Sequence, residues 1–203
     1  MSSPITIYTV GHSTHTIEKF LDLLGRNGVT AVADVRSSPF SRHNPQFNKD
    51  TLSAELKRRG IAYVFVGKEL GARSDDPSCY EGGKVRYGRL AKTSVFKAGI
   101  ERVLSGAQKY RIALMCAEKE PLDCHRTLLV SRALEQHGVS IVHILSDGST
   151  ETQRQTMSRL LDLVGLPQVD MFRSRDELVA TACELREQKV AYVDEALAEQ
   201  ERQ

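Results

Sequence analysis

Two cysteines bracket a short polar loop near the middle of the chain, and this loop holds a dense set of reactive side chains. Seven residues separate Cys116 from Cys124, and His125 and Arg126 follow the second cysteine directly. Glu118 lies inside the loop. Thiols, a carboxylate, an imidazole and a guanidinium together can support nucleophilic or redox catalysis, anion binding or metal binding.

The sequence leaves three interpretations of the two cysteines open. One of them could be a nucleophile or redox centre, because the start of a helix favours the thiolate. Cys116, Cys124 and a histidine could instead bind zinc or iron, although the C-x7-C-H spacing differs from that of zinc fingers. Both cysteines could also pack as small buried side chains. We favour the first interpretation, and nothing in the sequence requires a metal or cofactor.

Gly11, His12 and Ser13 form a second polar cluster, after a run of β-branched residues. Glycine permits a tight turn, and the free N–H groups at the start of a helix are suited to an anion. The chain has neither a G-x-G-x-x-G fingerprint nor a Walker lysine here. The cluster predicts a substrate-binding turn with His12 as an acid–base group, or else an ordinary helix cap beside a turn histidine.

Asp34 and Arg36 flank Val35 at the end of the next apolar run. In strand geometry these two side chains point to the same face. Arg36 could clamp a phosphate or carboxylate while Asp34 orients it or acts as a base. The alternative is a structural ion pair. Arg42, in the Ser- and Pro-containing loop that follows, is a second candidate for binding an anion.

Each of these clusters follows a segment with the pattern of a buried strand. Such segments cover residues 5–10, 29–35, 61–66, 111–115 and 139–145, with helical patterns between them. The alternation predicts a Rossmann-like α/β three-layer sandwich with a mostly parallel sheet of about five strands. Because the carboxyl ends of parallel strands meet at one edge, we expect the clusters to line one crevice there.

Two other segments have a different character. Residues 67–93 are polar and Gly-rich, which is typical of a lid or binding loop. Beyond Gly148 the strand–helix alternation stops, and residues 152–164 and 175–201 look helical. We therefore expect an α/β domain carrying the site at residues 1–148 and a C-terminal helical extension at residues 149–203. The extension could pack on the domain or support a homo-oligomer.

Composition narrows the class of protein. The chain has 203 residues, 40% of them hydrophobic, and a net charge of +2. Because basic and acidic residues are interleaved, no general basic field for nucleic acid is indicated. No secretory signal and no apolar run of about 18 residues is recognisable, so we expect a soluble, cytoplasmic protein without membrane association. Four cysteines are too few for a disulfide scaffold of this size.

An ordered set of motifs along residues 5–147 resembles the family called domain of unknown function 488, or DUF488. The motifs are IYTVGHS at residues 7–13, Asp34-Val35-Arg36 followed by Pro39 and Ser41, Leu70-Gly71, Cys116-Ala117-Glu118 and Cys124-His125-Arg126. The resemblance implies a cytosolic bacterial or archaeal protein with a Rossmann-like core. It also implies that the motif residues form an active site, without indicating a reaction.

The leading hypothesis is an enzyme that acts on an anionic, phosphate-bearing substrate such as a nucleotide or nucleic acid. The residues expected to carry catalysis are Cys116, Glu118, Cys124, His12 and Asp34, and those expected to bind the substrate are Gly11, Ser13, Arg36, Arg42, His125 and Arg126. One alternative is a thiol redox or sulfur-chemistry protein using the two loop cysteines. Another is a module that binds a small anionic ligand or nucleic acid without transforming it.

Overall fold

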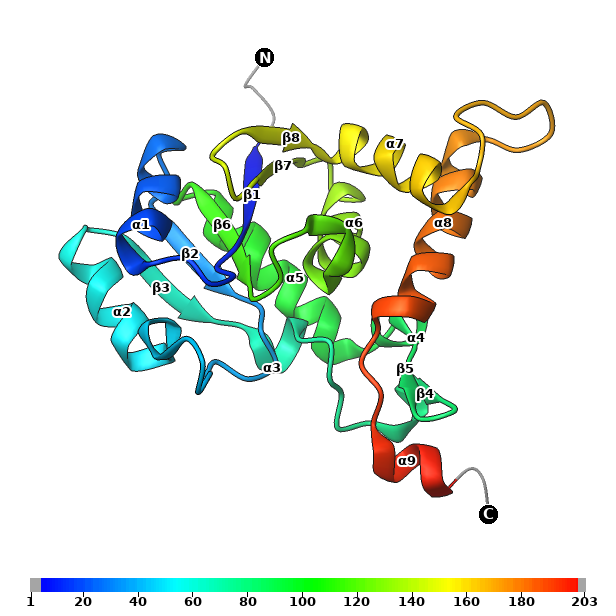
Figure 1. Cartoon of the computed structure of the whole chain (residues 1–203), viewed down its shortest axis with the longest axis horizontal. Coiled ribbons are helices and arrows are strands. Elements are labelled where there is room, and N and C mark those ends of the chain that lie inside the picture. Colours follow the sequence, from blue (N-terminus) through cyan, green and yellow to red (C-terminus); the bar gives the residue numbers. More distant parts are fainter. Residues whose placement is uncertain (1–4, 201–203) are drawn as a thin grey trace.

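A twisted six-stranded sheet forms the centre of the molecule in a computed structural model that describes residues 5–200 (Figure 1). The strands are β1 (Thr6–Gly11), β2 (Ala31–Asp34), β3 (Ala62–Phe65), β6 (Ile112–Cys116), β7 (Ser140–Ile144) and β8 (Thr150–Thr152), in the order β3-β2-β6-β1-β7-β8. The first five are parallel and β8 is antiparallel to β7. The predicted α/β class with a mostly parallel sheet is confirmed.

The sheet has one strand more than expected, because the chain turns back after β7. The Leu145 N–H donates to the carbonyl of Ser149, and Gly148 adopts a φ of +95° between them. This turn returns Thr150–Thr152 along the edge of β7. The extra strand is short and polar, so it carries no apolar pattern that would have revealed it in the sequence.

Helices cover both faces of the sheet and complete three layers. On one face α1 (Ile17–Arg26) and α2 (Lys49–Arg58) pack against alternate strand residues such as Val32 and Met115. On the other face lie α5 (Ser94–Ala107), the π-helical segment Arg126–Ser131 and α6 (Arg132–Glu135). The strands are apolar on both sides because both sides are covered.

The segment 67–93 is not an open loop. It contains α3 (Gly67–Leu70), a 3-10 turn (Pro77–Cys79), the two-residue strands β4 (Tyr80–Glu81) and β5 (Lys84–Val85), and α4 (Tyr87–Leu90). Cys79, Tyr80, Val85 and Tyr87 are buried in the core on the α5 side. These buried side chains anchor the segment to the domain.

The C-terminal part comprises α7 (Gln153–Val164), α8 (Arg175–Val190) and α9 (Glu195–Gln200). The predicted single helix 175–201 is interrupted, because Val193 forms an antiparallel bridge with Lys84 and Asp194 accepts hydrogen bonds from the next helix start. Residues 1–4 and 201–203, which the expected boundaries include, lie outside the described residues.

Residues 153–190 share the core of the α/β unit. Leu160 and Leu161 of α7 and Leu178 and Ala182 of α8 belong to the same buried cluster as the apolar residues of α5. Figure 1 shows α8 running down one side of the molecule toward β4 and β5. Among residues 5–200, no helix combines the length and the apolar character that crossing a membrane requires.

Candidate functional site

The strand ends that carry the polar clusters lie side by side. Gly11, the last residue of β1, is in register with Cys116, the last residue of β6, and Asp34 at the end of β2 is in register with Met115. The pairing continues beyond the strands, because the N–H groups of His12 and Ser13 donate to the carbonyls of Cys116 and Ala117, both at 2.9 Å. Sequence segments about a hundred residues apart therefore meet at one rim.

Gly11 is required by the close approach of the cysteine loop. A Cβ at this position would lie 1.9 Å from the Glu118 carbonyl oxygen and 3.3 Å from Nη2 of Arg126. The backbone N–H groups of His12 and Ser13 are occupied by carbonyls, and Thr16, not Ser13, caps α1 by accepting from the Lys19 N–H. The first turn thus serves to hold two loops together.

Asp34 and Arg36 form a buried ion pair at the end of β2. Two guanidinium nitrogens of Arg36 donate to the two carboxylate oxygens of Asp34, at 2.9 and 2.7 Å. Arg36 also donates to the Phe47 carbonyl and to Nε2 of His12, and Asp34 accepts from the Tyr63 hydroxyl at 2.8 Å. Most of the hydrogen-bonding capacity of both groups is used within the protein.

His12 is neutral in this environment. Its ring stacks on Phe47 with 4.4 Å between ring centroids, and its Nδ1–H donates to the Ser13 carbonyl. Since Arg36 donates to the other ring nitrogen, the neutral tautomer satisfies both. Burial lowers the pKa of His12 to about 4, against the opposing effect of the Ser13 carbonyl.

Both sulfur atoms of the cysteine loop lie close to the imidazole ring of His125. Nδ1 of His125 lies 3.7 Å from Cys116 Sγ and 3.9 Å from Cys124 Sγ, and these three atoms all lie within 4.8 Å of one another. Sγ of Cys124 also lies 3.0 Å from the Glu118 carboxylate. His125 Nε2–H donates to the carbonyl of Val35 at 3.1 Å, which turns Nδ1 toward the two sulfurs.

The pKa values of Cys116 and Cys124 are shifted in opposite directions. Burial and the neighbouring Cys124 raise the pKa of Cys116 well above its ordinary value. Burial also opposes ionisation of Cys124, but the hydrogen bond from Cys116 and the charges of Arg126 and His125 outweigh it and hold the pKa of Cys124 well below its ordinary value. Burial raises the pKa of Glu118, and the Cys124 thiolate adds to this rise.

Arg126 lies beneath the cysteine loop and binds its backbone. Its side chain is fully buried and donates to the carbonyls of Glu118 and Lys119, while its backbone N–H donates to Cys124 Sγ at 3.4 Å. In the π-helical turn that follows, the Arg126 carbonyl accepts a hydrogen bond from the Ser131 hydroxyl at 2.7 Å. Single π-helical turns occur frequently at functional sites.

Two neighbouring pockets open onto this rim. One, of about 330 Å³, is lined by Cys116 and His125 together with Arg73, Tyr87 and Tyr192. The other, of about 440 Å³, is lined by His12, Ser13 and Lys119. Both are bordered by Arg36, Ser38, Phe40, Ala117 and Glu118. The two pockets form a divided cleft, which we call the rim cleft.

The structure brings together most, but not all, of the residues singled out in the sequence. His12, Ser13, Arg36, Cys116, Glu118 and His125 line the rim cleft, whereas Gly11, Asp34, Cys124 and Arg126 lie behind its wall. Arg42 is exposed and lines neither pocket. Sequence reasoning missed Arg73, Lys119 and Tyr192. Arg73 follows the Leu70-Gly71 motif, but nothing in the sequence marks Tyr192.

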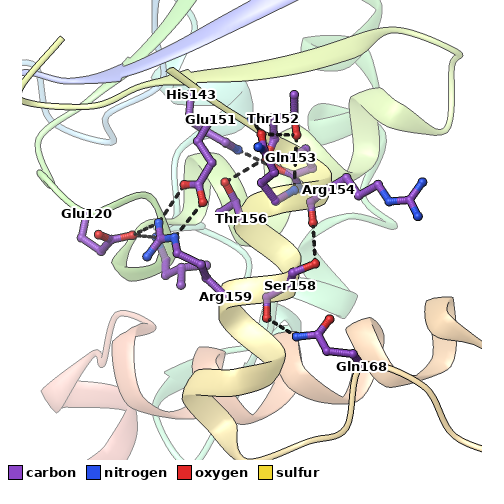
Figure 2. Close-up of polar contacts among 12 residues, drawn as sticks. Glu120, His143, Glu151, Thr152, Gln153, Arg154, Thr156, Ser158, Arg159 and Gln168 are labelled. Carbon is purple, nitrogen blue, oxygen red and sulfur yellow. Dashed lines mark hydrogen bonds and ion pairs between the residues drawn. The ribbon is translucent and has the colours of Figure 1, made fainter. Parts of the chain in front are cut away.

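The C-terminal helices brace the cysteine loop. Arg159 of α7 lies between the carboxylates of Glu151 and Glu120, with contacts of 2.7 to 2.9 Å, and Figure 2 shows this bridge from β8 to the loop. Arg186 of α8 donates to the Leu122 carbonyl at 3.2 Å and pairs with Asp123. Both helices therefore contact the 3-10 turn (Pro121–Asp123) that precedes Cys124.

Comparison with known proteins identifies a family but not an activity. No curated protein and no solved structure matches the chain. The family model described as "Domain of unknown function DUF488" matches residues 16–133, which is more than half of the chain. This range includes Asp34, Arg36 and the whole cysteine loop. The chain belongs to the DUF488 family.

Proposed function

We propose that this protein is an enzyme that acts on an anionic, phosphate-bearing small molecule of the nucleotide class, bound in the rim cleft. The observation that carries the proposal is the position of Cys116, Glu118 and His125 on the wall of a cleft at the carboxyl ends of parallel strands. In open α/β sheets this is the usual place for a ligand. Each pocket also falls within the size range of small-molecule sites.

Two exposed cations favour an anionic substrate. Arg73 lines one pocket and Lys119 lines the other, and both are solvent-exposed. They replace Arg36 and Arg126 as the proposed anion-binding groups, because those guanidiniums are engaged within the protein. Hydroxyls of Ser37, Ser38 and Ser41 line the same cleft and offer further donors to phosphate.

The reactive groups border the same pockets as the two cations. Glu118 borders both pockets, and its carboxylate lies 3.0 Å from Sγ of the buried Cys124. A substrate phosphate held by Arg73 or Lys119 would place the adjoining bond near Glu118, Cys116 and His125. A nucleotide is favoured over a long nucleic acid because the chain has a net charge of only +2.

A panel of nucleotides and phosphate esters tests the proposal by thermal shift and by product formation. Arg73→Gln and Lys119→Gln should each weaken binding of the responding ligand about tenfold, as expected for loss of a charge-assisted contact. Arg154→Gln and Lys92→Gln, which remove exposed charges elsewhere, are the matched controls. Glu118→Gln should retain binding and lose turnover. Binding without turnover in the wild type would instead indicate a binding module, and no response to the panel would contradict the proposal.

A second candidate function is thiol redox chemistry. The Sγ atoms of Cys116 and Cys124 lie within 4.8 Å of each other, and both cysteines are free thiols. A disulfide would form as an external disulfide accepts two electrons and the two thiol protons. Equilibration in a glutathione redox buffer, read by the mass of the alkylated protein, tests this. If both sulfurs are alkylated across the whole range of potentials, the redox function is excluded.

A further inference from the structure

We propose that Cys116, Cys124 and His125 form a zinc site with an open fourth position facing the rim cleft. Their three donor atoms are the one group of histidine, cysteine and carboxylate atoms with metal-ligand spacing within residues 5–200. Two thiolates and an imidazole are ligands that zinc prefers. Metal binding does not depend on the proposed substrate, but the use of the metal in catalysis rests on the proposed function.

The distances between the donor atoms fit a tetrahedral ion. Zinc bonds of about 2.3 Å to sulfur and about 2.0 Å to nitrogen place the S and N ligands of a tetrahedron about 3.5 Å apart. The separations from His125 Nδ1 to Cys116 Sγ and Cys124 Sγ are 3.7 and 3.9 Å. Both sulfur-to-nitrogen separations exceed this value by only a few tenths of an ångström. The two Sγ atoms lie within 4.8 Å of each other and would have to close to about 3.8 Å on binding.

The surroundings of the histidine provide a second, independent argument. Metal-bound histidines commonly donate their other ring N–H to a carbonyl or carboxylate, which fixes the ring. Nε2 of His125 donates to the Val35 carbonyl at 3.1 Å, and this carbonyl belongs to a different strand end. Nδ1 is thereby aimed at the two sulfurs. The Arg126 backbone N–H, 3.4 Å from Cys124 Sγ, would stabilise a bound thiolate further.

Charge and access are also consistent with zinc. Cys116 and Cys124 are both buried, and two adjacent buried thiolates would repel each other unless a dication neutralised them. Cys116 and His125 line the rim cleft, so the fourth position of the ion would face bound substrate. Three protein ligands with one open position are typical of catalytic zinc sites.

Glu118 is the adjacent base in this arrangement. Glu118 borders both pockets, and its carboxylate lies 3.0 Å from Cys124 Sγ. For hydrolysis, Glu118 accepts a proton from water at the fourth position as the water oxygen bonds to the electrophilic atom of the substrate. The bond to the leaving group then breaks, and Glu118 returns the proton to that group. Water is the co-reactant, and no oxidant or reductant is needed.

Metal content and cobalt spectra of the full-length, untagged chain test the site. The protein is stripped with a chelator under reducing conditions and then titrated with Zn²⁺ or Co²⁺. We expect one ion per chain, release of thiol protons on binding, and a cobalt spectrum with thiolate charge-transfer and tetrahedral d–d bands. Cys116→Ser, Cys124→Ser and His125→Gln should each lower zinc affinity at least tenfold, whereas Glu118→Gln should retain it.

Cys79→Ser and Cys183→Ser are the matched controls, because both thiols are buried outside the cluster. Circular dichroism of each variant checks that it is folded. Absence of stoichiometric zinc binding by folded wild type, or equal affinity in the site variants and the controls, would overturn the metal site. Stoichiometric zinc without any response to the substrate panel would leave the site standing and overturn the proposed function.

Discussion

Backbone contact at single residues decides how the cysteine loop is seated. Gly11 lies against the Glu118 carbonyl at a distance that leaves no room for a Cβ. Cys116 and Cys124 are both buried, but their neighbours differ, so the pKa of Cys116 is raised and the pKa of Cys124 is lowered. The atoms that each of these residues faces therefore decide its role at the site.

Gly11→Ala is expected to destabilise the protein by about 3 kcal/mol, because backbone atoms of Glu118 would have to shift. The measurement is the free energy of unfolding in denaturant. Gly25→Ala is the matched control, since nothing lies within 4 Å of a Cβ there and alanine favours the helix α1. Equal stability of the two variants would show that the two loops can separate without cost.

Asp34→Asn is expected to cost about 3–5 kcal/mol, because it leaves the buried Arg36 guanidinium without its countercharge. Asp22→Asn, at an exposed pair with Arg26, should cost less than about 1 kcal/mol. Denaturant unfolding measures both. If Asp34→Asn abolishes activity at unchanged stability, Asp34 acts in catalysis and the ion pair is not its main role.

At the scale of elements, polar side chains join α7 to the sheet. His143 of β7 accepts from the Thr9 hydroxyl of β1 at 2.7 Å and donates to Gln153 Oε1 of α7 at 2.6 Å, a contact included in Figure 2. Because α7 also holds Glu120 through Arg159, the sheet and the cysteine loop are tied to the same helix. The position of the site thus depends on how α7 docks.

The stability of this junction should depend on pH. Burial lowers the pKa of His143 from 6.5 to about 4. As the pH falls below 6.5, His143 takes up a proton in the unfolded state but stays neutral in the folded state until about pH 4. The free energy of unfolding should therefore decrease by about 3 kcal/mol between pH 6.5 and pH 4. Unfolding free energies of the wild type should fall across this window. His143→Gln should make the fall smaller without abolishing it, because burial also lowers the pKa of His12 to about 4. His137→Gln, at an exposed site, is the control.

At the scale of the whole molecule, the C-terminal helices complete both the core and the cleft. Met157, Leu160 and Leu178 are buried in the cluster beneath α5 and α6. Tyr192, which follows α8, lines the rim cleft and lies under the Arg73 guanidinium at 4.3 Å from its ring centroid. Residues 153–192 therefore take part in the structure of the α/β unit.

A chain ending at Gly148 is expected to lose its cooperative unfolding transition. Each large apolar side chain left uncovered costs about 1.5–3 kcal/mol, and several such losses approach the 5–15 kcal/mol that stabilises a typical domain. A chain ending at Asp194, which lacks only α9 and the residues beyond it, should keep the transition. Equal denaturation midpoints for the Gly148 truncation and the full chain would show that residues 1–148 are an independent domain.

Much of the fold was predictable because strands that are buried on both faces appear in the sequence as continuous apolar runs. The strands around Val32 and Leu114 are continuous apolar runs, and α1 carries its buried residues at helical spacing after a Thr16 cap. Parallel strands then place the motif residues at one edge whatever the strand order is. Both the sheet and the neighbourhood of the polar clusters follow from these local patterns.

Other features depend on contacts between distant segments and leave no local pattern. The polar strand β8, the break before α9 and the place of Tyr192 in the cleft wall depend on what packs beside them. The same holds for the Val35 carbonyl that turns His125 toward the two sulfurs. The sequence could name the thiols and the imidazole, but their separations arise only when three strand ends and two C-terminal helices pack together.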